Sequence, residues 1–189
     1  MTNLLNVPDN LPVPQDDGLT DHLPGMALPN VQLPATSGGL IDLSTIGGIL
    51  VIYCYPRTGR PGEALPNGWD DIPGARGCTP QACSFRDHYG ELQALGAQVF
   101  GLSTQTTDYQ HEMVERLHIP FPVLSDADFA LCEALQLPTF EVAGMRLIKR
   151  VTLIVRNGII DKIHYPVFPT HSDPEWVISH LSRSSQDQR

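Results

Sequence analysis

The sequence predicts an α/β fold: a mixed central sheet with helices on both faces. Three observations lead to this prediction. Apolar, β-branched runs alternate with amphipathic helical segments, a pattern typical of parallel sheets. A strong hairpin signal late in the chain adds antiparallel strands. The chain has 189 residues, a length that suits one domain with a core of its own.

The N-terminal part of the chain predicts an extended arm followed by a hairpin. Residues 1–24 are rich in Pro, Asp and Asn, which favours an arm outside the domain proper at residues 25–185. Two short apolar stretches flank a Ser-Gly-Gly turn at residues 37–39 and predict an N-terminal β-hairpin extension. The run GGILVIYCYP, which ends at Pro56, then predicts a buried central strand.

A long loop and a helix follow this strand. Residues 57–77 are full of Gly and Pro, and long structureless loops inside compact domains are usually functional. The next helix is expected to take Thr79 as its cap and Pro80 as its first helical residue. Apolar side chains recur at helical spacing as far as Leu95, and Gly96 is expected to end the helix.

The second half of the chain continues the alternation. AQVFGLST predicts a buried strand, TTDYQHEMVERLH a helix capped by a Thr, PFPVLSD a short strand, and DADFALCEAL a short helix that starts at its first Asp. A hairpin is expected around Asn157-Gly158, and the closing helix is expected to have Asp173 as its cap. This order of elements is that of a thioredoxin-like fold with an N-terminal extension.

Composition limits the partners and the compartment. The formal net charge is −9, which argues against nucleic-acid and anionic-membrane partners. No apolar run approaches the roughly 20 residues that span a bilayer, and the first residues lack a secretory signal pattern. We therefore expect a cytoplasmic protein with reduced thiols, in which a cysteine pair is more often catalytic or metal-binding than structural.

Two cysteines lie at the expected start of the helix, in GARGCTPQACSFRDHY. The helix N-terminus favours a thiolate at Cys78, and Arg76 adds positive charge nearby. In a regular helix, Cys83 lies five residues further on at a Cα separation of roughly 8.7 Å, beyond the ~7 Å limit for a disulfide. The two thiols can therefore bond only if the first turn unwinds, and first turns are weakly anchored.

Other interpretations of the cysteines stay open. On spacing alone, Cys78 and Cys83 fit two small buried hydrophobic residues equally well. A zinc site is a third alternative, although no second Cys or His pair at ligand spacing accompanies them. Cys54 and Cys132 lie in apolar elements and are expected to be core residues, and Trp69 is expected to pin the long loop to the domain.

The cysteine segment GCTPQACSFRDHY resembles the active-site helix of peroxiredoxins of the Q class, also called the bacterioferritin comigratory protein type. Segments on both sides resemble the same class in the same order: LVIYCYP, VFGLSTQTTDYQHEMVERLHIPFPVLSDADFALCEALQLP and LIKRVTLIVRNGIIDKI. The resemblance covers roughly residues 27–182. It implies a thioredoxin-like fold and membership of the wider redoxin superfamily.

The resemblance also implies an activity, a thiol-dependent peroxidase acting on hydrogen peroxide or small organic hydroperoxides. Cys78 matches the peroxidatic cysteine and Cys83 the resolving cysteine that forms an intramolecular disulfide with it. Arg150 matches the arginine that fixes thiolate and peroxide, and Pro56 matches the proline that opens the active-site loop. Thioredoxin is the implied reductant, no metal or organic cofactor is implied, and a monomer is expected.

The chain departs from the family pattern just before the peroxidatic cysteine. The proline and the cysteine are further apart than in the family by about 15 residues, so residues 57–77 carry an insertion. The Thr or Ser that the family has three residues before the cysteine is Ala75 here. Thr58 is the first candidate for the missing hydroxyl and Thr79 a weaker one, while arginine and backbone amides alone are a third possibility.

Two other functions remain open from the sequence. One is a thioredoxin-fold disulfide oxidoreductase or redox sensor that relays oxidation to a partner protein, although the chain lacks a CxxC motif. The other is a binding module whose insertion meets a partner and whose thiols are vestigial. A thiol titration with peroxide separates the binding module from the two redox functions.

Overall fold

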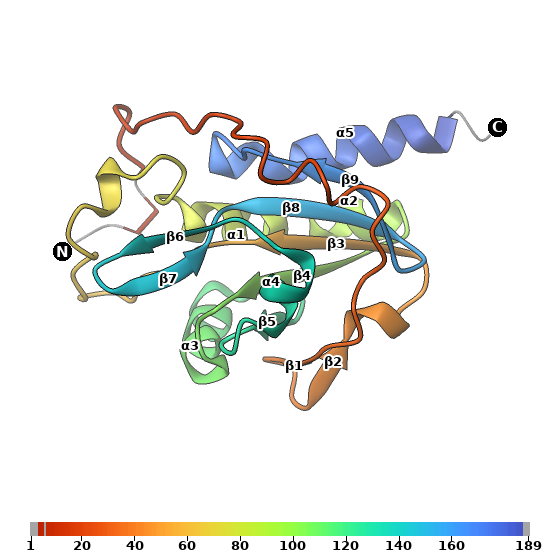
Figure 1. Ribbon diagram of the computed structural model, residues 1–189, viewed down its shortest axis with the longest axis horizontal. Helices are drawn as coiled ribbons and strands as arrows, with labels where there is room; N and C mark the ends of the chain where they lie inside the picture. Colours follow the sequence, from red (N-terminus) through yellow and green to blue (C-terminus); the bar gives the residue numbers. More distant parts are fainter. Residues whose placement is uncertain (1–3, 6, 187–189) are drawn as a thin grey trace.

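A five-stranded mixed sheet forms the centre of the molecule, of which the computed structural model describes residues 4–5 and 7–186 (Figure 1). Its strands are β3 (Ile49–Cys54), β4 (Ala97–Ser103), β5 (Val123–Ser125), β8 (Val151–Arg156) and β9 (Ile159–His164). Their order across the sheet is β5-β4-β3-β8-β9. β3 pairs in parallel with β4 and antiparallel with β8, so the predicted central position of this strand is confirmed.

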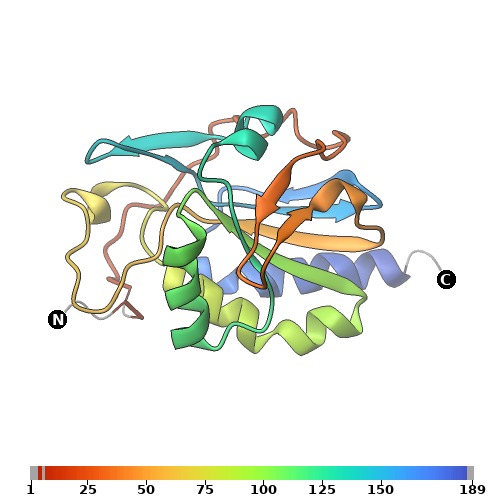
Figure 2. The same cartoon turned by 90° about the horizontal axis from the view of Figure 1, so that it is seen from below.

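Helices cover the two faces of the sheet unequally (Figure 2). Four helices pack on one face and only α4 packs on the other, together with the N-terminal segments. The prediction of helices on both faces is confirmed, with this asymmetry. The four helices are α1 (Cys78–Asp87), α2 (Tyr89–Ala94), α3 (Thr107–Leu117) and α5 (Asp173–Gln186); α4 spans Ala130–Leu135.

The N-terminal segments cover the face that α4 leaves open. The predicted hairpin is present as β1 (Gln32–Pro34) and β2 (Leu40–Asp42), which pair antiparallel. In the preceding arm, Leu23 is buried, and Asp17 forms an ion pair of 2.6 Å with Lys149. The described part of the arm is therefore attached to the domain; residues 1–3 and 6 of the predicted arm lie outside the described residues.

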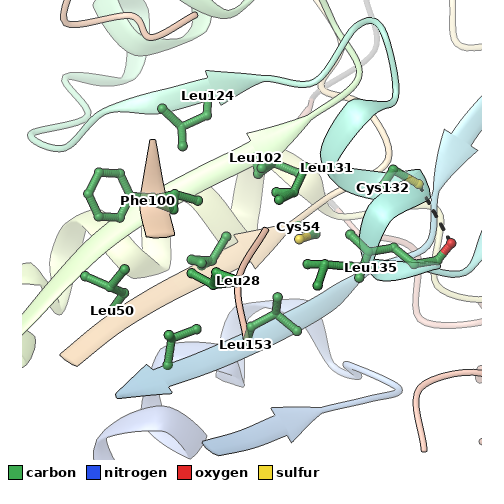
Figure 3. Packing of buried hydrophobic residues seen from close by; sticks show 14 of the residues in the cluster. Leu28, Leu50, Cys54, Phe100, Leu102, Leu124, Leu131, Cys132, Leu135 and Leu153 are labelled. Carbon is green, nitrogen blue, oxygen red and sulfur yellow. Dashed lines mark hydrogen bonds between the residues drawn. The ribbon is translucent and has the colours of Figure 1, made fainter. Parts of the chain in front are cut away.

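The core consists of two apolar layers, one on each face of the sheet. Alternate side chains of β3 enter opposite layers, as the pleat requires: Ile52 and Cys54 face α4, whereas Tyr53 faces α1. Figure 3 shows Cys54 and Cys132 among the leucines of the first layer. Burial raises the pKa of Cys132 to about 11 and that of Cys54 further. Both are core residues, as predicted, and burial keeps them in the unreactive thiol form.

The start of the cysteine helix differs from the prediction. α1 begins at Cys78 itself, after Gly77, so Thr79 lies inside the first turn and the prediction of Thr79 as the cap is wrong. Gly77 has φ 105°, and a Cβ there would collide with Thr170, so only glycine fits. Pro80 also lies in the first turn of α1. Its missing N–H group removes no hydrogen bond from the helix, because first-turn N–H groups have no partner within the helix.

The predicted single helix as far as Leu95 is in fact two helices. α1 ends at Asp87 and α2 begins at Tyr89, with His88 between them outside the helical conformation. Gly96 has φ 78° and ends α2 where the sequence predicts.

A second hairpin was not predicted. β6 (Thr139–Val142) and β7 (Met145–Ile148) pair antiparallel across an Ala-Gly turn and form a two-stranded sheet of their own. The sequence LIKRVTLIV suggests one continuous strand, but the chain leaves β7 after Ile148 and enters β8 at Val151. This break leaves Arg150 outside both strands.

Two aspartates predicted as helix starts have other positions. α4 begins four residues after Asp126, whose carboxylate still accepts the N–H groups of Leu131 and Cys132. Asp173 is the first residue of α5, and its carboxylate bonds side chains of other elements, so its prediction as a cap is wrong. Throughout the described residues, every helix is too short or too polar to cross a bilayer.

Candidate active site around Cys78

Cys78 lines a small cavity at the N-terminal end of α1. The cavity has a volume of about 20 Å³, room for roughly one water-sized molecule. The Cys78 side chain is only 4% exposed, so the cavity is its route to solvent molecules. Its Sγ lies 3.2 Å from Nη2 of Arg150 and 3.7 Å from the carbonyl oxygen of Ala75.

Arg150 links the end of the long loop to the cysteine helix. Its Nε donates to the carbonyl of Gly74 (3.3 Å), and its Nη2 donates to those of Ala75 (3.1 Å) and Arg76 (3.4 Å). Its Nη1 donates to Oε1 of Gln81 on α1. The planar fork of five donors therefore fixes the loop, the helix and the sulfur relative to one another.

The charge of Arg150 has a consequence for Cys78. The guanidinium is buried, and within the described residues it makes no ion pair with a carboxylate. Besides neutral carbonyl and amide oxygens, the atom that this buried positive charge contacts is Sγ of Cys78.

The long loop both covers the cavity and is anchored to the domain. Trp69 is 3% exposed and packs with Val142 and Leu147 of the unpredicted hairpin, which confirms the expected pinning. Trp69 also lines the cavity. Arg76, expected to add positive charge near Cys78, instead forms an ion pair of 2.9 Å with Asp70, which offsets its charge.

Both candidate threonines line the same cavity as Cys78. Thr58 is buried, and its N–H and Oγ1 both donate to Oε1 of Gln105, at 3.0 and 3.2 Å. Nε2 of Gln105 donates back to the Thr58 carbonyl at 3.1 Å. Gln105 thus holds the start of the loop and directs Thr58 into the cavity. Pro56, two residues before Thr58, is buried just after β3.

Cys83 lies apart from the cavity, one and a half turns further along α1. It is half-buried, and its thiol and that of Cys78 are both free. Burial raises the pKa of the Cys83 thiol. In this regular helix the two cysteines are therefore separate, and Cys83 is held in the less nucleophilic thiol form.

A second, larger cavity is lined by Arg150. It measures about 300 Å³ and is lined by the loop at Ile72, by Phe140 and by Val167, but not by Cys78. Cys78 lines the small cavity and not the large one, so the small cavity is the candidate reaction site.

Sequence reasoning missed two residues of this site, Gln81 and Asp173. Gln81 follows Cys78 by three helical positions and so shares its helix face, a signal that could have identified it. Asp173 gives no such signal, because its partners come from distant parts of the chain. Among the described residues, no group of three or more His, Cys, Asp or Glu side chains could hold a metal ion.

Comparison with known proteins identifies the family. The family model described as Redoxin matches residues 23–178. The chain belongs to the redoxin family. The match covers the whole of the sheet and all the elements around Cys78, so the resemblance drawn from the sequence motifs is confirmed at family level.

Curated relatives of this redoxin carry peroxiredoxin names. It is 33% identical over 110 residues to a putative peroxiredoxin bcp of Coxiella burnetii, covering 58% of this chain and 63% of the relative. It is 32% identical over 110 residues to peroxiredoxin Bcp of Escherichia coli, covering 58% and 61%. Over 141 residues it is 29% identical to chloroplastic peroxiredoxin Q of Oryza sativa subsp. japonica, covering 74% and 58%. The alignments thus span about six-tenths of each relative's length.

Solved structures share the fold of this redoxin. Peroxidoxin BcpB of Mycobacterium tuberculosis superimposes with a TM-score of 0.69 at 22% identity, over 85% of this chain and 96% of that one. The bacterioferritin comigratory protein of Xanthomonas campestris superimposes with a TM-score of 0.65 at 20% identity, over 93% of this chain and 99% of that one. The predicted thioredoxin-like fold is confirmed by these similarities.

Proposed function

We propose that this redoxin is a peroxiredoxin of the Q class, a thiol-dependent peroxidase that acts on hydrogen peroxide or small organic hydroperoxides. One observation carries the proposal. The buried guanidinium of Arg150 lies 3.2 Å from Sγ of Cys78, at a helix N-terminus and beside a cavity of about 20 Å³. The peroxiredoxin names of the curated relatives support it.

In the first step, the Cys78 thiolate attacks one oxygen of the peroxide. An S–O bond forms as the O–O bond breaks, so the sulfur is oxidised to a sulfenic acid and the peroxide is reduced. The leaving oxygen takes a proton and departs as water or an alcohol. Negative charge moves from the sulfur to that oxygen, and the Nη2 donor of Arg150, 3.2 Å from Sγ, supplies a fixed positive charge beside the reacting sulfur.

Thr58 supplies the hydroxyl that Ala75 lacks. Its one proton is donated to Gln105, which leaves its oxygen lone pairs to accept the O–H of a bound hydroperoxide. Thr79, which lines the same cavity from α1, is the second hydroxyl at the site. Pro56 sets the direction of the loop that carries Thr58 and so completes the family's set of site residues.

In the second step, Cys83 resolves the sulfenic acid. The first turns of α1 unwind, Cys83 becomes exposed, and the burial that raises its pKa is removed. Its sulfur attacks Sγ of Cys78, an S–S bond forms, and water leaves. Because both cysteines lie on one helix, no second copy is needed, and we propose a monomer with residues 25–185 as its catalytic domain.

A dithiol reductant completes the cycle by exchange with the Cys78–Cys83 disulfide, and cytoplasmic thioredoxin is the proposed partner. The test is a thioredoxin-coupled assay of hydrogen peroxide consumption by the wild-type chain. Turnover with each peroxide equivalent consuming one equivalent of dithiol is expected. Fast exchange with protein disulfides and no peroxide turnover would instead assign the redox-relay function.

Widening the cavity should change the preference among peroxides. Leu65 of the insertion lines the cavity, and replacing it by Ala removes apolar bulk where the tail of a larger hydroperoxide would lie. In Leu65→Ala we expect kcat/KM for cumene hydroperoxide relative to hydrogen peroxide to rise about tenfold. The matched control is Leu40→Ala on the exposed hairpin strand. An unchanged ratio would mean that the insertion does not limit substrate size.

A further inference from the structure

A buried carboxylate stands behind the cysteine helix, away from the cavity and from direct contact with the sulfur. Asp173 and Gln81 are both fully buried. Oδ2 of Asp173 accepts a hydrogen bond of 2.7 Å from Nε2 of Gln81. Oε1 of Gln81 accepts a hydrogen bond from Nη1 of Arg150, and Nη2 of the same guanidinium lies 3.2 Å from Sγ of Cys78. A continuous chain of hydrogen bonds therefore runs from Asp173 to the sulfur of Cys78.

The carboxylate dictates which way round the amide of Gln81 lies. Oδ2 of Asp173 accepts from both Gln81 and Thr152, so the NH₂ end of Gln81 faces Asp173. The carbonyl end is then left to face Arg150, which only donates. If the Gln81 amide were reversed, its NH₂ group would face the guanidinium donors, and the two would repel.

Asp173 is itself fixed from three elements. Oδ2 also accepts from Oγ1 of Thr152 on β8 at 2.7 Å, and Oδ1 accepts from Nδ1 of His164 on β9 at 2.7 Å. The ring of His164 is in turn stacked on Trp176 of α5 at 4.3 Å. These contacts hold the carboxylate of Asp173 in one orientation, in which Oδ2 also accepts the hydrogen bond from Gln81.

We infer that Asp173 is a positioning residue for the peroxidase reaction, which aims the Arg150 guanidinium at Cys78 by fixing the orientation of Gln81. The inference rests on the proposed function. A positioning role differs from a purely structural one in what a substitution changes. Replacing Asp173 should slow the oxidation of Cys78 and leave the later steps of the cycle unchanged.

Asp173→Asn tests the inference because it keeps the shape and adds a donor. Its NH₂ group can donate to Oε1 of a reversed Gln81, which then turns its own NH₂ toward Arg150. In a Cys83→Ser background, where the reaction stops at the sulfenic acid, we expect hydrogen peroxide to oxidise Cys78 about tenfold more slowly. The readout is sulfenic acid trapped by dimedone and quantified by mass spectrometry. Asp128→Asn, at an exposed position, is the matched control and should oxidise at the parent rate.

A second change should restore the lost rate. In Gln81→Glu, both side-chain oxygens of residue 81 are acceptors. One can accept from Arg150 and the other from the NH₂ group that Asp173→Asn introduces. The double variant Gln81→Glu with Asp173→Asn is therefore expected to oxidise Cys78 faster than Asp173→Asn alone, a non-additive result. Gln81→Glu alone places two carboxylates together and is expected to be slow.

The outcomes separate the inference from the function on which it rests. Without Cys78 oxidation in the parent Cys83→Ser protein, the proposed function itself fails. If the parent is oxidised and Asp173→Asn matches it, only the positioning role is overturned. A slow Asp173→Asn that the second change does not rescue also overturns it, because that pattern indicates general loss of structure.

Discussion

A Cys78→Ser variant is expected to consume no hydrogen peroxide above the uncatalysed rate. Serine preserves the size and the hydrogen-bonding position at the start of α1, but its oxygen is neither ionised near neutral pH nor able to form a sulfenic acid. The other cysteines cannot substitute, because Cys54 and Cys132 are buried and held as thiols. The measurement is the thioredoxin-coupled assay with hydrogen peroxide.

The control for this prediction is Cys132→Ala, a substitution away from the cavity. It should keep the wild-type turnover per folded protein, although removal of a core side chain lowers the thermal midpoint. Substantial turnover by Cys78→Ser would show that another thiol carries the reaction.

Replacing Arg150 by Ala is expected to slow the oxidation of Cys78 by about 10²–10³-fold, the range for removing a preorganised donor from a charge-developing site. The variant loses the positive charge beside Sγ of Cys78 and the donors for the carbonyls of Gly74, Ala75 and Arg76. The carbonyl of Ala75, which is buried, then loses its donor, so the loop should also become less stable. The rate is measured as dimedone-trapped sulfenic acid in the Cys83→Ser background.

Arg150→Lys separates charge from geometry. Lysine keeps a positive charge but cannot donate to the loop, to Gln81 and to sulfur at the same time. Its rate is expected to lie between those of wild type and Arg150→Ala. If Arg150→Ala oxidised Cys78 as fast as wild type, the guanidinium would have no part in activating the sulfur.

Local patterns were sufficient for most of the fold. The β-branched run of β3, the Asn157-Gly158 turn and the Thr106 cap of α3 each depend on neighbours in sequence, and each is found as predicted. The β6–β7 hairpin was missed although its pairing is local, but the failure at the start of α1 depends on a distant contact. Gly77 is needed just before α1 because Thr170, far along the chain, leaves no room for a Cβ, and nothing near Gly77 in the sequence reports this.

The site follows the same division. The helix signature around Cys78 and the strand motif around Arg150 were enough to expect the two residues together, and their side chains are 3.2 Å apart. Asp173 was misassigned because an Asp before Pro at a helix start is the usual pattern of a cap. Its three partners are brought to it only by the packing of α1, β8 and β9.

In the proposed mechanism the sulfur of Cys78 is oxidised, and Cys83 reaches it only when α1 opens. Peptide mass spectrometry of the wild-type chain, treated with one equivalent of hydrogen peroxide and alkylated, tests it most directly. We expect a Cys78–Cys83 disulfide, with Cys54 and Cys132 alkylated as free thiols after denaturation. A Cys78 that stays reduced, or one that stops at the sulfenic acid while Cys83 remains a free thiol, would contradict it.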